Sequence, residues 1–185
     1  MYATSVRSTT TMATQPLNTD QSFYAPKFRA KTGMKKGNYT KLTRLWFQNS
    51  SNFELDGLAL QGLKIDHIDV GLVRCSFVVL DHLSDRDGNW NVGAIAILID
   101  SLAAGAVFSM TGGHLATVDY TMSFYSTVKV KEEVEIEAKV VGEKGNLASV
   151  IIDIKKKSNG EKVVIGKQWM HSVPIKTPHC MQSKL

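Results

Sequence analysis

The chain has 185 residues, enough for one ordinary domain and a tail, and a formal net charge of +5. Residues 1–44 hold eight Lys or Arg against one acidic residue, whereas the remaining 141 residues hold 14 basic and 16 acidic side chains. Bulk charge therefore argues against a nucleic-acid-binding body. The two cysteines, Cys75 and Cys180, lie far apart without metal-ligand spacing. They suit a reducing compartment better than a disulfide scaffold.

Residues 1–48 are predicted to form a disordered basic leader. Residues 1–40 are rich in Ser and Thr, contain one acidic residue and lack hydrophobic periodicity, so they cannot bury enough apolar surface to order themselves. The same composition is typical of a plastid or mitochondrial transit peptide. A transit peptide and a solvated tail both stay open. We expect the folded domain to span residues 49–174 and a flexible tail to follow over residues 175–185.

The first part of this domain shows a short helix and a hairpin. Residues 53–61 favour a helix that ends at Gly62. From residue 63 the hydrophobic period becomes two, which predicts a strand over residues 72–79 and a hairpin partner over residues 63–70. The predicted turn lies near Gly71. A polar loop rich in Asp and Gly over residues 81–89 then leads into the centre of the chain.

The stretch from residue 91 to residue 110 predicts one long helix that is apolar on every side, with a single carboxylate, Asp100, at its middle. Such a helix must be enclosed by protein or by lipid. A membrane span is the less favoured interpretation, because the apolar run is at the lower length limit and Asp100 lies where insertion is most penalised. The strands on both sides also need a helix to pack on.

Asp100 has two interpretations that its position leaves open. It is either a structural acid that hydrogen-bonds to backbone or to a partner subunit, or a general base or nucleophile in a site of low dielectric constant. Backbone N–H groups at the positive end of the same helix make a carbonyl-polarising site plausible. The sequence contains no Gly-rich phosphate loop, no GxSxG elbow and no cluster of metal ligands, and its histidines are scattered. We therefore predict no metal site and find no other catalytic motif.

Four further strands are predicted after Gly112 and Gly113, over residues 117–124, 133–140, 149–154 and 163–171. In the first of them the alternation places Val118 on the face of Tyr120, and Thr117 on the face of Asp119. Turns are expected at residues 142–146 and 159–160, which makes these strands a meander. An antiparallel sheet with one apolar helix to cover is expected to curl around that helix. The fold class is therefore α+β, with about six strands.

Two stretches carry a resemblance to a known family, DRDGNWNVGAIAILID before and in the helix and ATVDYTMSFYSTVKVKEEVEIEAKV after it. They resemble the hotdog-fold acyl-CoA thioesterases of the phenylacetate-degradation type, over about residues 53–172. That family has a signature like HGGxxxxLxD at the helix, followed by VSVDxxxxYLxP and an acidic alternating strand. The resemblance implies a hotdog fold, in which a curved antiparallel sheet wraps a long central helix.

The resemblance also assigns roles to residues. The catalytic Asp of the helix falls on Asp100, and the Ser or Thr that positions the attacking water falls on Thr117. The HGG triplet falls on Asn91, Val92 and Gly93, as substrate-binding residues, and a loop Asn of the site falls on Asp85. This sequence departs from the family at the triplet and the loop. Val92 keeps the N–H that polarises the thioester carbonyl, whereas Asn91 cannot titrate and Asp85 adds a negative charge.

The function that the resemblance implies is hydrolysis of a fatty or aromatic acyl-CoA to free acid and CoA. It requires no cofactor, and the enzymes of this family act as homodimers or dimers of dimers. The alternative from another class is a non-catalytic hotdog protein that binds acyl-CoA or a related ligand, favoured by the altered triplet. Hydratase or dehydratase chemistry ranks last, because the expected His-centred arrangement is missing.

The last three residues, Ser183, Lys184 and Leu185, match a peroxisomal import signal that a receptor recognises. We therefore expect a peroxisomal location and a peroxisomal import receptor as a partner. The transit-like leader favours a plastid or a mitochondrion instead.

Overall fold

The computed structural model describes residues 41, 43, 45 and 47, residues 54–112 and residues 114–173. The predicted tail, and the predicted leader apart from those four residues, lie outside this part of the chain. The elements run in the order α2 (Glu54–Ala59), β1 (Lys64–Asp69), β2 (Leu72–Val78), a 3-10 turn (Asp81–Leu83), α3 (Val92–Thr111), β3 (His114–Phe124), β4 (Glu133–Lys144), β5 (Leu147–Lys156) and β6 (Lys162–Val173).

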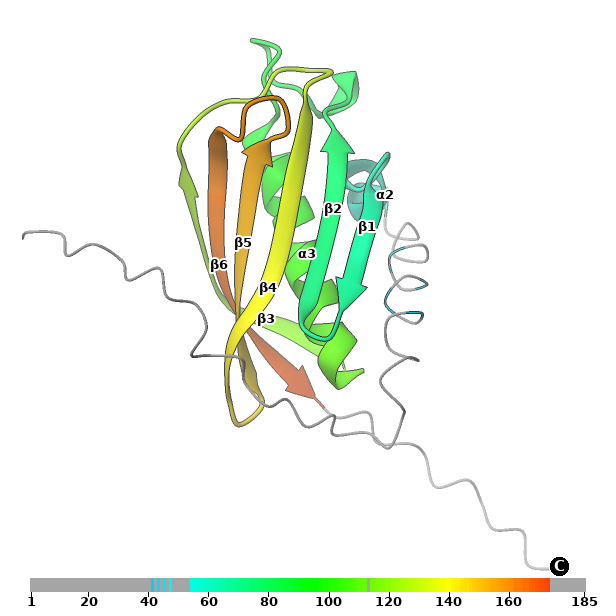
Figure 1. Ribbon diagram of the computed structural model, residues 1–185, viewed down its shortest axis with the longest axis vertical. Helices are drawn as coiled ribbons and strands as arrows, with labels where there is room; N and C mark the ends of the chain where they lie inside the picture. Colours follow the sequence, from blue (N-terminus) through cyan, green and yellow to red (C-terminus); the bar gives the residue numbers. More distant parts are fainter. Residues whose placement is uncertain are drawn as a thin grey trace, which may run out of the picture.

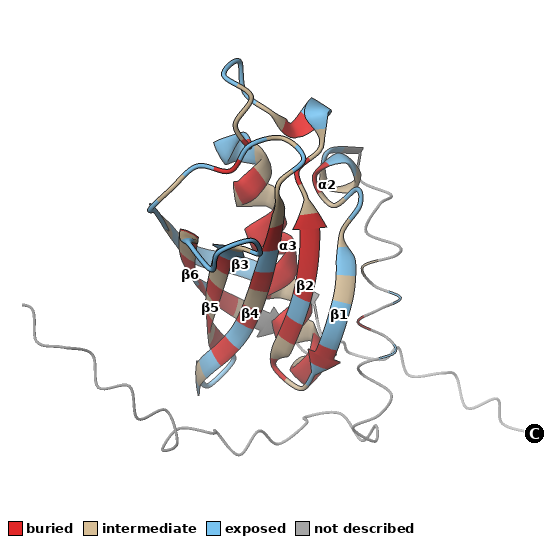
Figure 2. Ribbon diagram, turned by 45° about the horizontal axis from the view of Figure 1, so that its top comes forward, coloured by how far each residue is buried: buried red, intermediate tan, exposed pale blue. Residues whose placement is uncertain are grey.

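Six antiparallel strands form one sheet in the order β1-β2-β4-β5-β6-β3, and the sheet curves around α3 (Figure 1). Along each central strand, buried side chains face α3 and alternate with exposed or half-buried ones on the outer face (Figure 2). The predicted α+β hotdog arrangement, with a long central helix wrapped by six strands, is confirmed.

The predicted meander is wrong for the first of its four strands. β4, β5 and β6 follow one another in the sheet, but β3 pairs with β6 at the far edge instead of with β4. β2 pairs with β4 and takes the position beside it. The arrangement places β4 and β5, whose buried side chains alternate regularly along the strand, over the helix, and leaves the largely exposed β3 at the edge.

The apolar character of α3 is explained by its surroundings. By length and composition alone α3 would suffice to cross a membrane, with a mean hydropathy of 2.0 over its most apolar window. In the fold, 61% of that window is buried. Fully buried side chains such as Leu98, Ile99 and Leu102 contribute to the single core of the domain. Packing against the sheet thus accounts for an apolar surface that a solvent-exposed helix would not carry.

The β1–β2 turn depends on Gly71, which has a φ of 75°. A Cβ at this position would lie 2.9 Å from the Met110 Sδ and 3.4 Å from the Val140 Cβ. We expect Gly71→Ala to lower the free energy of unfolding by about 2–3 kcal/mol, because it combines a left-handed backbone with crowding against the core. Denaturant titration measures this change.

Gly160→Ala is the matched control for this prediction. Gly160 also lies in a hairpin turn with a positive φ, of 72°, but a Cβ there would meet nothing within 4 Å. Its substitution carries only the backbone cost of about 1 kcal/mol. Equal losses for the two variants would contradict a crowding effect at Gly71.

Candidate active site

The start of α3 is shaped by Asn91, which is the N-cap residue. The Asn91 Oδ1 accepts hydrogen bonds from the backbone N–H groups of Gly93, at 2.8 Å, and Ala94, at 3.4 Å. An Asn in this position satisfies donors that a helix start otherwise leaves unpaired. Within the described part of the chain, the Val92 N–H has no acceptor, and Val92 is 55% exposed. Of the predicted triplet, Val92 therefore offers the N–H that a ligand can reach.

Asp85 does not join these residues through hydrogen bonds. Its Oδ1 accepts from the backbone N–H groups of Asp87 and Asn89, both at 2.9 Å, and its Oδ2 accepts from the Asn89 Nδ2 at 3.3 Å. These bonds, that of the Asn89 backbone first, lower the pKa of the Asp85 carboxyl from its usual value. Within one chain, Asp85 thus stabilises the conformation of its own loop. Its predicted catalytic role stays a prediction.

Asp100 and Thr117 do come together. The Thr117 hydroxyl donates a hydrogen bond of 2.7 Å to the Asp100 Oδ1, which joins the middle of α3 to β3. None of the ion pairs in the described part of the chain includes Asp100. A carboxylate held by neutral donors keeps a lone pair for a proton, as a general base requires.

A β-bulge gives Thr117 this orientation. In the β3–β6 pairing, Thr117 lies opposite Met170 and Asp119 lies opposite Trp169, so Val118 is the extra residue. Val118 is 61% exposed, whereas the regular alternation places it on the same face as Tyr120, whose hydroxyl contacts α3. That prediction is wrong at this point, because a bulge reverses the faces of the residues on one side of it. Thr117 consequently points to α3 instead of outward.

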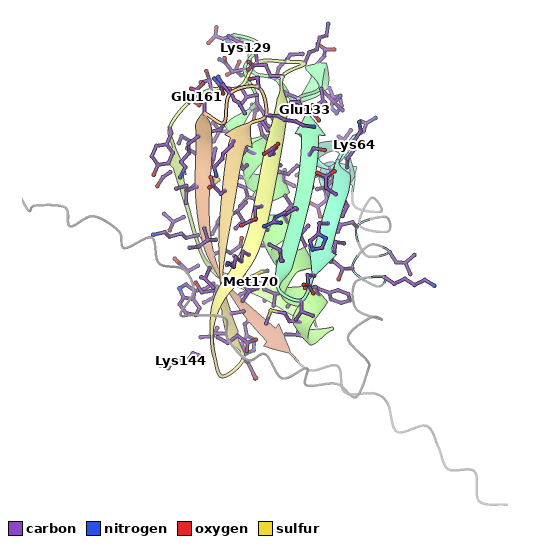
Figure 3. The ribbon with its side chains drawn as sticks, in the orientation of Figure 1. Lys64, Lys129, Glu133, Lys144, Glu161 and Met170 are labelled. Atoms are coloured by element: carbon purple, nitrogen blue, oxygen red, sulfur yellow. The ribbon has the colours of Figure 1, made fainter. Side chains whose placement is uncertain are left out.

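Gln168 is a further residue of this site, and the sequence did not predict it. This residue lies on β6, is fully buried, and donates from its Nε2 to the Asp100 Oδ1 and, at 2.8 Å, to the Thr117 Oγ1. The signal that would have identified it is a polar residue in an apolar series, since its neighbours on the same face are Val164, Gly166 and Met170. In Figure 3, Met170 marks the region of β6 two residues beyond Gln168.

Tyr120 closes the same site from β3. Its hydroxyl donates to the Ala96 carbonyl oxygen at 3.0 Å, one helical turn before Asp100. Burial raises the pKa of Tyr120, and the negative charge of Asp100 adds to this effect. Tyr120 therefore stays a neutral donor across the physiological range. Among the described residues there is no group of three His, Cys, Asp or Glu that could hold a metal ion.

An apolar pocket of about 280 Å³ lies beside the start of α3. The bridge between Asn89 and Lys129 places this start at the end of the sheet where Figure 3 labels Lys129 and Glu133. The pocket is lined mainly by aromatic and aliphatic side chains from the start of α3 and the loop before it, from the end of β3 and the segment after it, and from β6: Trp90, Val92, Ile95, Phe124, Tyr125, Ser126, Thr127, Val128 and Val163. An apolar group can thus lie next to the exposed N–H of Val92.

Part of the chain is similar in sequence to known thioesterases. A family model described as "Thioesterase superfamily" matches residues 87–163. The chain is 26% identical over 98 residues to mouse acyl-coenzyme A thioesterase 13, which covers 52% of this chain and 70% of the mouse protein.

Solved structures show the same fold. The E. coli PaaI protein from the phenylacetic acid degradation operon has a TM-score of 0.65 and 15% identity, over 75% of this chain and 95% of PaaI. A hypothetical thioesterase from Streptococcus pneumoniae, solved with coenzyme A, has a TM-score of 0.61 and 19% identity, over 66% of this chain and 95% of that protein.

Proposed function

We propose that this chain, whose residues 87–163 form a thioesterase-superfamily domain, is an acyl-CoA thioesterase that hydrolyses a fatty or aromatic acyl-CoA to free acid and CoA. The observation that carries the proposal is the Asp100 carboxylate, which two neutral donors hold and no described cation pairs with. The name of the mouse relative and the coenzyme A bound to the pneumococcal protein support a CoA thioester as the substrate.

The site requires two copies of the chain. Val92 and Asp100 lie eight residues apart on one helix, which separates them by about 12 Å at 1.5 Å per residue. The oxygen of a thioester carbonyl and the water that attacks its carbon lie only about 3–3.5 Å from that carbon. One chain therefore cannot place both groups on the same thioester. We infer that Val92 of one subunit faces Asp100 of the partner subunit.

The edge strand β3 supports such a homodimer. It spans 11 residues, pairs with β6 on one side only, and exposes Val118 and Phe124, with Tyr125 directly after it. A long edge with exposed apolar side chains is normally covered in a stable protein. Pairing with β3 of a second copy would cover it and bring the Thr117 side of each subunit to the interface.

The reaction then follows from the geometry. The Val92 N–H donates to the carbonyl oxygen and stabilises the negative charge that develops there. Asp100 of the partner subunit, with Thr117, takes a proton from water as the water oxygen attacks the carbonyl carbon. The tetrahedral intermediate collapses, the carbon–sulfur bond breaks, and the proton goes to the CoA thiolate. Direct attack by the carboxylate, followed by hydrolysis of the anhydride, uses the same groups.

The apolar pocket beside Val92 is suited to the acyl group. Its aromatic and aliphatic lining would exclude water from a hydrocarbon chain or an aromatic ring, and Val92 itself restricts the space next to the carbonyl. The substrate range is therefore expected to depend on the size of the group that fits beside Val92.

A non-catalytic acyl-CoA-binding protein is the second candidate, and Asn91 favours it. The Asn91 side chain occupies the N–H groups of Gly93 and Ala94, so Val92 alone remains to polarise a carbonyl. Thiol release from acyl-CoAs of short, medium and long chains and from aromatic acyl-CoAs separates the two functions. The enzyme releases CoA from at least one of them, whereas a folded protein that binds acyl-CoA without turnover would overturn the proposed hydrolysis.

A further inference from the structure

We propose that Gln168 is a positioning residue, which fixes the orientation of the Asp100 carboxylate for the proposed hydrolysis. Its Nε2 donates to both the Asp100 Oδ1 and the Thr117 Oγ1, and the Thr117 hydroxyl donates to the same Oδ1. The three side chains come from β6, α3 and β3 and close a triangle of hydrogen bonds. The positioning role rests on the proposed function, in which Asp100 is the base.

The arrangement distinguishes the two oxygens of the carboxylate. Oδ1 accepts from Thr117 and Gln168, whereas no described residue donates to Oδ2. Asp100 is only partly buried, so Oδ2 is the oxygen left for solvent or substrate. Because the Gln168 amide is fully buried in the sheet, it holds the triangle more firmly than a surface side chain would.

The other end of Gln168 shows that this contact does not serve stability alone. Its Oε1 is buried and has no donor among the described residues. A buried acceptor without a partner destabilises a fold. Turning the amide over would place Oε1 against the Asp100 Oδ1, two acceptors with no proton between them. The observed orientation therefore keeps the hydrogen bond to the carboxylate and leaves the Gln168 Oε1 without a donor among the described residues, a local cost of the kind that functional sites often carry.

The test compares Gln168→Met with wild type for turnover of the most reactive acyl-CoA and for thermal unfolding. Met has a similar length and no N–H, so it removes the donor and also the unsatisfied oxygen. We expect kcat to fall at least tenfold with KM within about twofold, and Tm to stay unchanged or rise. Gln168→Glu, which is nearly the same size and presents oxygen atoms to Asp100, is expected to lose at least as much kcat.

Ile152→Val is the matched control, because Ile152 is fully buried on the neighbouring strand β5 and belongs to the hydrophobic core. It should lower Tm and leave kcat unchanged, the opposite pattern to Gln168→Met. A Gln168→Met protein with lowered Tm and wild-type kcat would overturn the positioning role. If wild type hydrolyses no acyl-CoA, the proposed function fails. The positioning role then fails with it, because the role rests on Asp100 as the base of that reaction.

Discussion

Replacing Asp100 with Asn is expected to lower kcat for acyl-CoA hydrolysis by about 10³-fold, within the range that general base catalysis contributes. Asn has the same shape, and its Oδ1 can still accept from Thr117 and Gln168, so the fold should persist. What it lacks is the charged, basic oxygen that takes a proton from water, because an NH2 group replaces Oδ2. Thiol-release kinetics measure the loss, and the thermal unfolding temperature verifies that the variant is folded.

Asp66→Asn is the control for the change of charge. Asp66 lies on β1, at the edge of the sheet opposite to β3, and its side chain is exposed. It should hydrolyse acyl-CoA at the wild-type rate. Affinity for acyl-CoA should survive in Asp100→Asn, because the carboxylate acts on water rather than on the ligand. Wild-type turnover in Asp100→Asn would mean that the base lies elsewhere and that Asp100 is structural.

The sequence predicts the helices and strands in which apolar and polar residues follow a regular pattern along the chain. The central helix, predicted over residues 91–110, is observed as Val92–Thr111. Its apolar composition follows from enclosure by the sheet, so local sequence and tertiary structure agree. Strand ends are less well determined. The turn predicted over residues 142–146 is shorter in the structure, since β4 reaches Lys144 and β5 starts at Leu147.

Strand order and the inner lining of the site depend on contacts between distant segments. Nothing local in β3 specifies that it pairs with β6, and a two-residue period gives no sign of the bulge at Val118 that turns Thr117 toward Asp100. The role of Gln168 becomes visible only once β6 is placed against α3. Only the family resemblance selects Thr117, because the alternation alone places it on the face of Asp119, opposite to Tyr120.

The Val92 N–H can be removed with little effect on the helix, which makes it the sharpest test of carbonyl polarisation. Val92 is the first residue of α3, the position where proline is most readily accepted, because its N–H has no intrahelical partner. The preceding residue, Asn91, has φ −64° and ψ 131°, a conformation that proline tolerates in its neighbour. We expect Val92→Pro to keep the N-cap and the Tm of the protein and to lower kcat by about 10²–10³-fold.

Val92→Ala separates this effect from the loss of the side chain. It keeps the N–H and opens the pocket beside the helix start, so it should hydrolyse compact acyl-CoAs at least as fast as wild type and accept bulkier ones better. Equal activity of the Pro and Ala variants would contradict a hydrogen bond from residue 92 to the thioester carbonyl.

The oxyanion would then need another donor, and the N–H groups of Gly93 and Ala94 are already bonded to Asn91. In that case Asn91 would have to leave its N-cap position when substrate binds, and Asn91→Gly, which frees both groups, should raise kcat instead of lowering it.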